Sequence, residues 1–256
     1  MKLTTWNING IRAREQALLR WIAVAQPDVL CLQEIKADLT QIPESLQNLA
    51  THTALWNGSA KKGYSGTALL VSNTLIQTHG DAVFSIPSFD AESRTVQAVI
   101  GKTVVIGVYV PRGEKDAAHY KWKLDFFTAL ETHTASLIAA GHDVVLCGDM
   151  NVAHKDLDVH PSQQNPEACG QRPPEREAID RVMATGFQDV YRNLHAGEEG
   201  CFSWWPYWRN ARERNLGWRL DYIYATPRLA ASATAAVIDS SEASSDHSPV
   251  STQFVI

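Results

Sequence analysis

Apolar, strand-like segments of this chain repeatedly end in a polar side chain, and this pattern constrains the fold more than any other feature of the sequence. A carboxylate behind a buried strand is costly unless it is paired, hydrogen-bonded or bound to a metal. The polar residues at or beside these ends are Asn7, Glu34, Tyr109, Asp149, Asn151, Asp221, Asp246 and His247. Because α/β sheets gather their sites at the ends of central strands, we expect these side chains to meet.

The apolar segments alternate with helical patterns, and no linker divides them, so we predict one α/β domain over residues 1–256. The predicted strands are "KLTTWNI", "DVLCLQE", "GTALLVS", "RTVQAVIG", "TVVIGVYVP", "HDVVLCGDMN", "RLDYIYA", "ATAAVI" and "VSTQFVI". Apolar residues at helical spacing predict helices over 14–25 and 117–140. Pro174, with acidic residues close behind it, predicts a further short helix. A loop rich in Pro, Gln and Asn precedes it, over 155–173.

The composition limits the classes of protein to consider. Hydrophobic residues make up 45% and charged residues 20% of the chain, which is typical of a globular protein. The net charge of −5 gives no overall attraction to a polyanion, so a site for one must be a local basic patch. We find no signal peptide and no uninterrupted run of roughly 18 apolar residues. We therefore expect a cytoplasmic protein with no membrane contact.

The four cysteines show no Cys-x-x-Cys or Cys/His spacing that would indicate structural zinc. Those in "VLCLQE" and "VVLCGD" are expected to be buried, reduced thiols within strands. The polar strand ends, in contrast, combine carboxylates with an imidazole, a phenol and amides. Such a set of oxygen donors suits Mg²⁺ or Mn²⁺.

Each polar residue also has an interpretation that involves no chemistry. Glu34 is compatible with a helix cap, Asp149 and Asn151 with turn residues, and Tyr109 with a half-buried core aromatic. Taken singly, these interpretations are favoured for most of the residues. Six separate strand ends with ionisable or amide groups are an improbable accident, so the joint interpretation as a site is preferred.

Motifs along the whole chain resemble the exonuclease III and apurinic/apyrimidinic (AP) endonuclease family, within the endonuclease/exonuclease/phosphatase superfamily. The matching stretches are "TWNINGIR", "LCLQEIK", "KGYSGTALL", "VYVPRG", "CGDMNVAH", "PPERE", "GWRLDYI" and "SSDHSPV", in the order of the family. The resemblance implies a DNase I-like α/β fold, a four-layer sandwich of two packed sheets flanked by helices. It also implies a phosphodiester hydrolase with a divalent metal.

The resemblance assigns roles to the polar strand ends. Glu34 is expected to be the principal metal ligand, and Asn7 to assist at the metal and the phosphate. Asp149 is expected to act on the attacking water or the leaving oxygen. The further metal ligands implied are Asp149, Asn151, Asp246 and His247, with Asp246 standing either as a ligand or just behind the ligands.

The remaining catalytic roles concern the phosphate. Asn151 and Tyr109 are expected to hold phosphate oxygens. His247 is expected to contact the scissile phosphate, with Asp221 orienting its ring. Neither the number of metal ions nor the assignment of protons between Asp149 and His247 follows from the sequence.

The substrate is indicated by "FSWWPYWRNARERNLGWRLDY", where tryptophans alternate with arginines. Cations for phosphates and flat rings for stacking or wedging are what a nucleic-acid surface needs, although some of these side chains are expected to be core or solvated surface. The segment favours DNA over lipid or inositol phosphates, and the intact polar set argues against a non-catalytic DNA-binding relative. The residues expected at DNA are Lys62, Tyr64, Arg112, Gly170, Trp204, Trp208, Arg209, Arg212, Trp218 and Leu220.

The resemblance therefore implies a monomeric base excision repair nuclease that acts on double-stranded DNA with abasic sites or blocked 3′ ends. It is expected to cleave 5′ to abasic sites and to have 3′-5′ exonuclease and 3′-phosphatase activity. Trp204, Trp218 and Leu220 are expected to line a pocket for the base-less sugar, and Trp208 to wedge into the duplex. Gly170 is expected to leave room for DNA on both sides of the lesion. Arg112 departs from the family, whose members commonly carry a small polar amide there.

Overall fold

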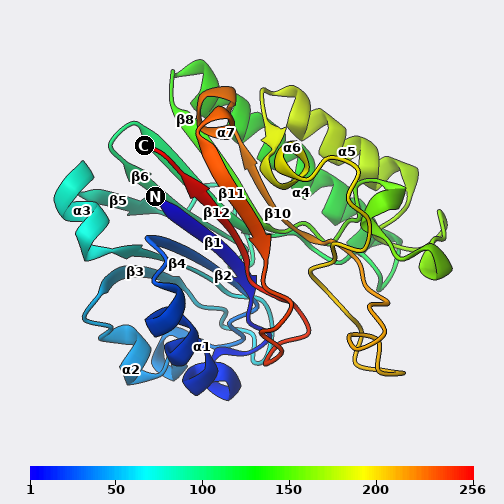
Figure 1. The fold of residues 1–256 in the computed structure, drawn as a ribbon, viewed down its shortest axis with the longest axis horizontal. Helices are drawn as coiled ribbons and strands as arrows, with labels where there is room; N and C mark the ends of the chain where they lie inside the picture. The colour runs from blue at the N-terminus through cyan, green and yellow to red at the C-terminus, as the bar shows by residue number, and fades with distance from the viewer.

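The computed structural model describes residues 1–256, which form two six-stranded sheets packed face to face between two layers of helices (Figure 1). The first sheet contains, in spatial order, β11 (Ala233–Ile238), β12 (Val250–Phe254), β1 (Lys2–Asn7), β2 (Val29–Gln33), β4 (Thr67–Ser72) and β3 (His52–Asn57). The second contains β5 (Ala82–Ser85), β6 (Thr95–Ile100), β7 (Thr103–Tyr109), β8 (Asp143–Asp149), β10 (Asp221–Ala225) and β9 (Gln188–Asp189). The predicted four-layer α/β sandwich is confirmed.

Some helices cover the two outer faces, and others pack Leu75, Val190 and Leu229 into the core between the sheets. The α-helices are α1 (Ile11–Ala25), α2 (Glu44–Gln47), α3 (Asn73–His79), α4 (Ala117–Ala139), α5 (Pro173–Ala184), α6 (Val190–Leu194) and α7 (Pro227–Ala231). Three short 3₁₀ turns are η1 (Leu39–Gln41), η2 (Asp156–Asp158) and η3 (Pro161–Gln163). Figure 1 shows α1 and α2 on one side of the paired sheets and α4 and α5 on the opposite side. None of these helices has the length and the hydrophobicity that crossing a bilayer requires.

The apolar residues divide into three cores that correspond to this layering. The first, between the sheets, includes Leu3, Cys31 and Leu69 from one sheet and Val105 and Cys147 from the other. The second lies between β7, β8 and β10 and the helices α4 and α5, and the third between α1 and the outer face of β1, β2 and β4. Both strand cysteines are buried and free, as predicted. Strands buried on both faces explain why the sequence reads there as continuous apolar runs.

Local signals fix the helix ends. The Asp116 side chain accepts from the backbone N–H of His119 and begins α4. α1 ends where Gln26 takes a left-handed conformation before Pro27. The predicted boundaries of α4 and α5 are correct to within one residue, whereas α1 begins three residues before the predicted residue 14.

The sequence did not predict β3, β5, β9, α2, α3, α6 and α7. β5 and β9 are short, and β3 is an edge strand with few fully buried residues, so none shows a strong apolar period. The helices have four to seven residues, too few for a helical period to be distinctive. The loop predicted over 155–173 is irregular apart from η2 and η3.

Sheet topology brings the polar strand ends together. β1 runs parallel to β2, and β7 runs parallel to β8, so the carboxyl ends of all four strands lie at one end of the sandwich. β10 is antiparallel to β8, with Asp221 opposite Asp149, so the beginning of β10 reaches the same end. The segment before β12 reaches it because β12 is antiparallel to β1.

Candidate active site

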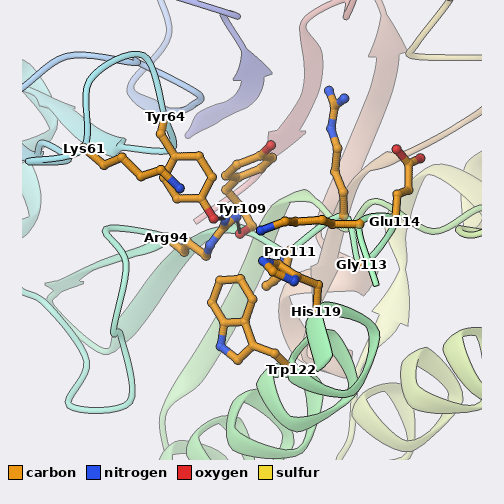
Figure 2. Close-up of a pocket in the computed structure, with 11 residues that line it drawn as sticks. Lys61, Tyr64, Arg94, Tyr109, Pro111, Gly113, Glu114, His119 and Trp122 are labelled. Carbon is orange, nitrogen blue, oxygen red and sulfur yellow. Dashed lines mark hydrogen bonds between the residues drawn. The ribbon is translucent and has the colours of Figure 1, made fainter. Parts of the chain in front are cut away.

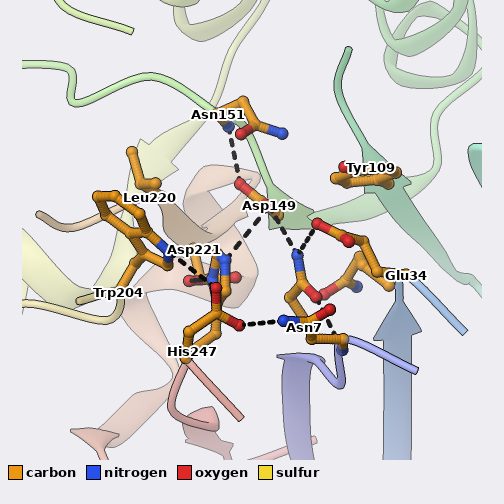
Figure 3. A network of polar contacts seen from close by, with 12 residues as sticks. Asn7, Glu34, Tyr109, Asp149, Asn151, Trp204, Leu220, Asp221 and His247 are labelled. Atoms are coloured by element: carbon orange, nitrogen blue, oxygen red, sulfur yellow. Dashed lines mark hydrogen bonds and ion pairs between the residues drawn. The ribbon is translucent and has the colours of Figure 1, made fainter. Parts of the chain in front are cut away.

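Asn7, Glu34, Tyr109, Asp149, Asn151, Asp221 and His247 converge at this end of the sandwich (Figure 3). Asp246 joins them through its hydrogen bond from Asn9. Hydrogen bonds or an ion pair link most of them directly, and all except the partly exposed Asn151 are buried. The convergence expected from the strand-end pattern is therefore present, with ligand atoms drawn from both sheets.

His247 lies between two carboxylates. Its Nδ1 donates to Asp221 Oδ2 at 2.8 Å, and its Nε2 lies 3.8 Å from Asp149 Oδ2. Burial alone would lower the pKa of His247, but the charges of Asp221 and Asp149 outweigh it and raise the pKa to about 9. The imidazole is therefore positively charged at neutral pH, with its ring orientation fixed by Asp221.

Ser203 holds Asp221 in turn. Its hydroxyl donates to Asp221 Oδ2 at 2.7 Å and accepts from the backbone N–H groups of Leu220 and Asp221 at 3.0 Å. The other carboxylate oxygen, Oδ1, is buried without a hydrogen-bond partner. A buried carboxylate oxygen with no donor favours a cation nearby.

Asn7 joins the two halves of the site. Its side-chain nitrogen Nδ2 donates to Glu34 Oε1 at 3.0 Å and to Asp149 Oδ2 at 2.9 Å. Its Oδ1 accepts from the backbone N–H of Asn9 at 3.1 Å. Since Glu34 follows β2 and Asp149 ends β8, one amide sets the separation of two carboxylates from different sheets.

Asp149 is placed by a close contact between strands. A side chain on the preceding residue, Gly148, would put its Cβ 1.9 Å from the carbonyl oxygen of Val108, so only glycine fits there. Burial raises the pKa of Asp149 above its usual range; the positive charge of His247 works against this rise, and the charges of Asp221 and Glu34 add to it. A carboxylate with a raised pKa is suited to accept a proton near neutral pH.

Two cations surround Glu34. Lys36 Nζ lies 2.6 Å from Oε2, and Arg112 Nη2 lies 3.4 Å from Oε1. Burial works to raise the pKa of Glu34, but these two charges and the amide of Asn7 lower it to about 2. The backbone of Glu34 has a φ of 50°, a strained conformation of the kind found at functional sites. The carboxylate is fully ionised and already stabilised by positive charge.

Asn151 and Tyr109 border the same cluster. The backbone N–H of Asn151 donates to Asp149 Oδ1 at 2.8 Å, and its Nδ2 donates to the Val110 carbonyl at 2.7 Å. The amide nitrogen is thus occupied by the protein, and the amide oxygen has no such partner. Tyr109 is buried at the end of β7 beside Glu34 and Asp149 (Figure 3). Burial and the nearby Glu34 charge raise its pKa, so the phenol remains a neutral hydrogen-bond donor.

Asp246 is held by three side-chain donors, one of which is the Ser245 hydroxyl at 3.3 Å. Asn9 Nδ2 donates to its Oδ1 at 2.8 Å, and Trp204 Nε1 donates to its Oδ2 at 3.2 Å. Burial works to raise its pKa, but the charge of His247 and the hydrogen bonds from Asn9 and Trp204 lower it. Asp246 is therefore an ionised group behind His247, and it also fixes one wall of the neighbouring pocket.

The donor set fits a divalent cation. One ligand atom from each of Asp149, Asp221 and His247 lies within 4.8 Å of the other two. Asp221 and His247 are hydrogen-bonded to each other, however, whereas Glu34 and Asp149 share one amide donor. We favour the Glu34 side of Asp149 for a metal ion because it leaves the Asp221–His247 pair intact, and because carboxylate oxygens are preferred ligands of Mg²⁺.

A small cavity of about 70 Å³ adjoins the catalytic cluster, and Trp204, Trp218, Leu220 and His247 contribute to its lining. The rings of Trp204 and Trp218 meet edge to face with centroids 5.7 Å apart. Short backbone bridges connect Trp204 to both Trp218 and His247. The three pocket residues expected from the resemblance are thus together, with His247 in the wall.

Gly170 lies at the rim of this cavity. A Cβ at this position would lie 3.1 Å from Trp218 Cζ3 and 3.1 Å from the Asn151 carbonyl oxygen. The φ of Gly170 is +90°, which other residues rarely adopt. Any side chain here would press on both the cavity wall and the strand end that carries Asn151.

The Trp- and Arg-rich segment contains side chains of different kinds. Trp208 and Arg209 are exposed and stack on each other at 5.2 Å, whereas Trp205 is buried core. Arg212 is half-buried, lies over the Trp205 ring, and donates to the carbonyls of Glu242 and Ser245. Arg212 therefore supports the segment that leads to Asp246 and His247.

Arg219 corrects part of the interpretation of this segment. It belongs to the segment whose arginines and tryptophans indicate a nucleic-acid surface, but its side chain is only 2% exposed. It forms ion pairs with Asp158 at 2.8 Å and Asp189 at 2.7 Å. These carboxylates neutralise the guanidinium in the interior, so Arg219 is a structural residue.

The basic turn before β4 is partly at the surface. Lys62 is exposed and has no ion pair. Lys61 lies 4.0 Å above the ring of Tyr64, whose hydroxyl donates to Glu92 at 2.6 Å. This turn and the Arg112 side chain line a second cavity next to the catalytic cluster.

The residues of this site that the sequence did not single out are Asn9, Lys36 and Ser203. Lys36 Nζ bridges Glu34 and Asn9 Oδ1, and the Asn9 amide reaches Asp246. Asn9 and Lys36 lie within "TWNING" and "LQEIK", two residues after Asn7 and Glu34 respectively. Each of these stretches therefore contributes a second polar residue to the site.

Comparisons with known proteins agree with this geometry. The model of the "Endonuclease/Exonuclease/phosphatase family" matches residues 4–247. An exodeoxyribonuclease of Bacillus subtilis is 34% identical over 253 residues, covering 98% of each chain. DNA repair nuclease APEX1 of Danio rerio is 32% identical, covering 98% of this chain and 81% of the relative.

Solved structures give the same result. An AP endonuclease from Archaeoglobus fulgidus is 30% identical and superposes with a TM-score of 0.88 over the whole of both chains. A 3′ phosphatase from Neisseria bound to a product DNA hairpin is 29% identical, with a TM-score of 0.87 over the whole of both chains. These similarities cover every residue of the cluster described above.

Proposed function

We propose, from the premise that this chain belongs to the endonuclease/exonuclease/phosphatase family, that it cleaves the phosphodiester 5′ to abasic sites in duplex DNA. The chain is a nuclease hydrolase of the exonuclease III type with an AP endonuclease function in DNA repair. Its 3′-5′ exonuclease and 3′-phosphatase activities would use the same site at blocked 3′ ends. A monomeric state, one domain over 1–256 and a cytoplasmic location remain predictions.

One observation carries the proposal. His247 contacts the carboxylate cluster through Asp221 on one side and lines the small apolar cavity on the other. A phosphate held at His247 therefore has its attached sugar beside Trp204 and Trp218. The cavity, about 70 Å³ in volume, is small beside a nucleoside with its base, which supports a nucleotide that lacks one as the substrate.

Glu34 and Asp149, with Asn7 and Asn151 beside them, are the residues we propose to hold the metal, and Mg²⁺ is the ion that suits their oxygen donors. When bound, it would supply Lewis acidity at a phosphate oxygen and lower the pKa of a water molecule. Lys36 and Arg112 lie beside Glu34, where their positive charges are also suited to a bound phosphate.

The two buried titratable groups have complementary proton roles in this proposal. Asp149 accepts a proton from the attacking water, because Asn7 and Asn151 hold its carboxylate in place beside His247. His247 remains protonated and donates to a phosphate oxygen, which offsets the charge that develops there. Tyr109 and Asn151 complete the set of groups that position the phosphate.

The test uses three labelled duplexes with Mg²⁺: one with an abasic site, one with a nick and a 3′ phosphate, and one intact. We expect cleavage 5′ to the abasic site, removal of the 3′ phosphate, and no internal cut in the intact duplex. Glu34→Gln should lose activity and bind Mg²⁺ more weakly in calorimetry, whereas Glu15→Gln, at a partly exposed carboxylate on α1 outside the site, should match wild type. Full activity in EDTA, or no action on the abasic duplex, would contradict the proposal.

A further inference from the structure

A second cavity lies on the other side of Arg112 from the small apolar pocket. Its volume is about 360 Å³, and it is lined by the turn with Lys61, by Arg94 before β6, by the segment that follows β7, and by the first turns of α4 (Figure 2). Arg112 lines both cavities, and Tyr109 belongs to the catalytic cluster and to this lining. A strand bound in the small pocket would therefore continue into this one.

The lining carries an excess of positive charge. Lys61, Arg94, Arg112 and Lys115 contribute four cations, and Glu114 is the single carboxylate among the lining residues. The chain as a whole has a net charge of −5, so these cations are a local concentration. A concave surface with such a charge raises the local concentration of anions.

Arg94 is the most unusual member of the lining. Its guanidinium centre lies 4.8 Å from the ring centroids of Tyr109 and Trp122 and 5.2 Å from that of Tyr64. The side chain is 4% exposed, yet its carboxylate partner, Glu92, lies 3.5 Å away and is 42% exposed. Its Nε has no hydrogen-bond partner. Its Nη2 donates to the Tyr64 hydroxyl at 2.6 Å and its Nη1 to the Tyr109 carbonyl at 3.3 Å. Arg94 therefore holds these aromatic residues in place and adds positive charge behind the cavity wall.

Flat rings stand beside these cations. Tyr64 and Trp122 are both partly exposed and both line the cavity. Cations for a phosphate and aromatic faces for a base are the two requirements of a site for an unpaired nucleotide. The absence of carboxylates other than Glu114 excludes a metal ion as the preferred occupant of this cavity.

We infer that this cavity binds a nucleotide of the DNA strand being cut, next to the scissile phosphate. Its phosphate lies against Arg112 and Lys115, two exposed cations of the lining, and its base lies against Trp122. The inference rests on the proposed function, since it takes DNA as the substrate. It adds a binding position that lies outside both the metal cluster and the apolar pocket.

The test is a set of abasic duplexes whose cut strand is shortened by one nucleotide at a time, on either side of the abasic sugar. Binding is measured in EDTA for wild type, Lys115→Gln and Trp122→Leu. One truncation should weaken wild-type binding about tenfold, and the same truncation should weaken binding to either variant by less than about twofold. Lys102→Gln, at an exposed lysine outside the cavity, should reproduce the wild-type series.

Thermal unfolding shows whether Trp122→Leu remains folded. Lys115 is exposed, so Lys115→Gln should not affect folding and tests the binding position independently. The inference is overturned if the series of wild type and both variants coincide, or if no single truncation weakens wild-type binding. Cleavage of the full-length abasic duplex in Mg²⁺ tests the proposed function separately, because the binding series needs no turnover. Lost cleavage with an intact series would contradict the proposed function alone.

Discussion

Asp221 and His247, which are 26 residues apart in the sequence, form one buried unit in which a carboxylate oxygen lies 2.8 Å from the imidazole Nδ1. Neither side chain is more than 2% exposed. The pair leaves Nε2 free to face Asp149 and the cavity. The Asp221 carboxylate therefore both orients the imidazole and stabilises its positive charge, so changes at either residue should affect the same step of catalysis.

His247→Ala should lower kcat about 10²–10³-fold, the usual effect of removing one positioned electrostatic group. Asp221→Asn should lower it less, because the ring remains but loses its fixed orientation and its charge. Since both changes act through one imidazole, the double variant should be little slower than His247→Ala. Single-turnover rates of the three variants on an abasic duplex measure this. Effects that multiply would show that the two residues act independently.

Gly170→His should suppress internal cleavage at abasic sites more than processing of 3′ ends. The new side chain would press on Trp218 and Asn151, which lie 3.1 Å from the position of a Cβ, and would narrow the path of the duplex beyond the lesion. Gly197→His is the matched control, since Gly197 also has a positive φ but nothing within 4 Å. The ratio of the two activities is the measurement. An equal loss of both would mean that Gly170 does not control the choice of substrate.

Trp218→Ala should reduce the discrimination between abasic and intact duplexes, because it enlarges the cavity beside His247. Trp208→Ala should weaken DNA binding and leave that discrimination unchanged, since Trp208 is exposed and lies outside the lining. Competition binding with both duplexes separates the two effects. If Trp218→Ala only destabilises the fold, by about 3–5 kcal/mol as for a core aromatic, with selectivity intact, its place in substrate selection is refuted.

Asp158→Asn should destabilise the protein by about 3–5 kcal/mol at neutral pH, because it leaves buried Arg219 with Asp189 as its only carboxylate partner. Burial works to raise the pKa of Asp158, but the charges and hydrogen bonds of Arg219 and Arg192 lower it. A lowered folded-state pKa gives stability that is complete above the unfolded value of about 3.9 and is lost as the pH falls through the folded value. The difference between wild type and variant in urea unfolding should therefore shrink at acid pH.

Asp125→Asn is the control for that experiment, because Asp125 forms an exposed pair with Lys121 four residues away. It should change the unfolding free energy by no more than about 0.5 kcal/mol. A pH-independent difference for Asp158→Asn would show that the charge of Asp158 is not what stabilises the cluster.

The strand-end pattern was sufficient to predict that Glu34, Asp149 and His247 meet. Glu34 and Asp149 lie where apolar runs stop, and His247 lies just before the last one begins. The order of strands in an α/β sheet brings such ends together. Boundaries of the long helices followed from periodicity in the same way. These parts of the structure are encoded locally, so one chain without relatives reveals them.

Partnerships between distant residues could not be predicted in this way. Arg219 resembles its neighbouring surface arginines in sequence, and only the folded chain brings Asp158, 61 residues away, to its guanidinium. Ser203 and Asn9 belong to the site because of what they hydrogen-bond, and nothing in their own surroundings in the sequence distinguishes them from loop residues. The charge and exposure of a side chain depend on its partners, which the pattern of a single segment does not contain.

The hydrogen bonds from Asn7 to Glu34 and Asp149 make the geometry of the active site depend on how tightly the two sheets pack against each other. The carboxylates belong to different halves of the sandwich, and their separation is maintained by the interior that lies between those halves. A slight loosening of the core between the sheets would move Glu34 away from Asp149 while every helix and strand remained formed. On heating, the enzyme should lose activity before its circular dichroism signal changes. Removing a methyl group from the core between the sheets should likewise lower activity at the distant active site.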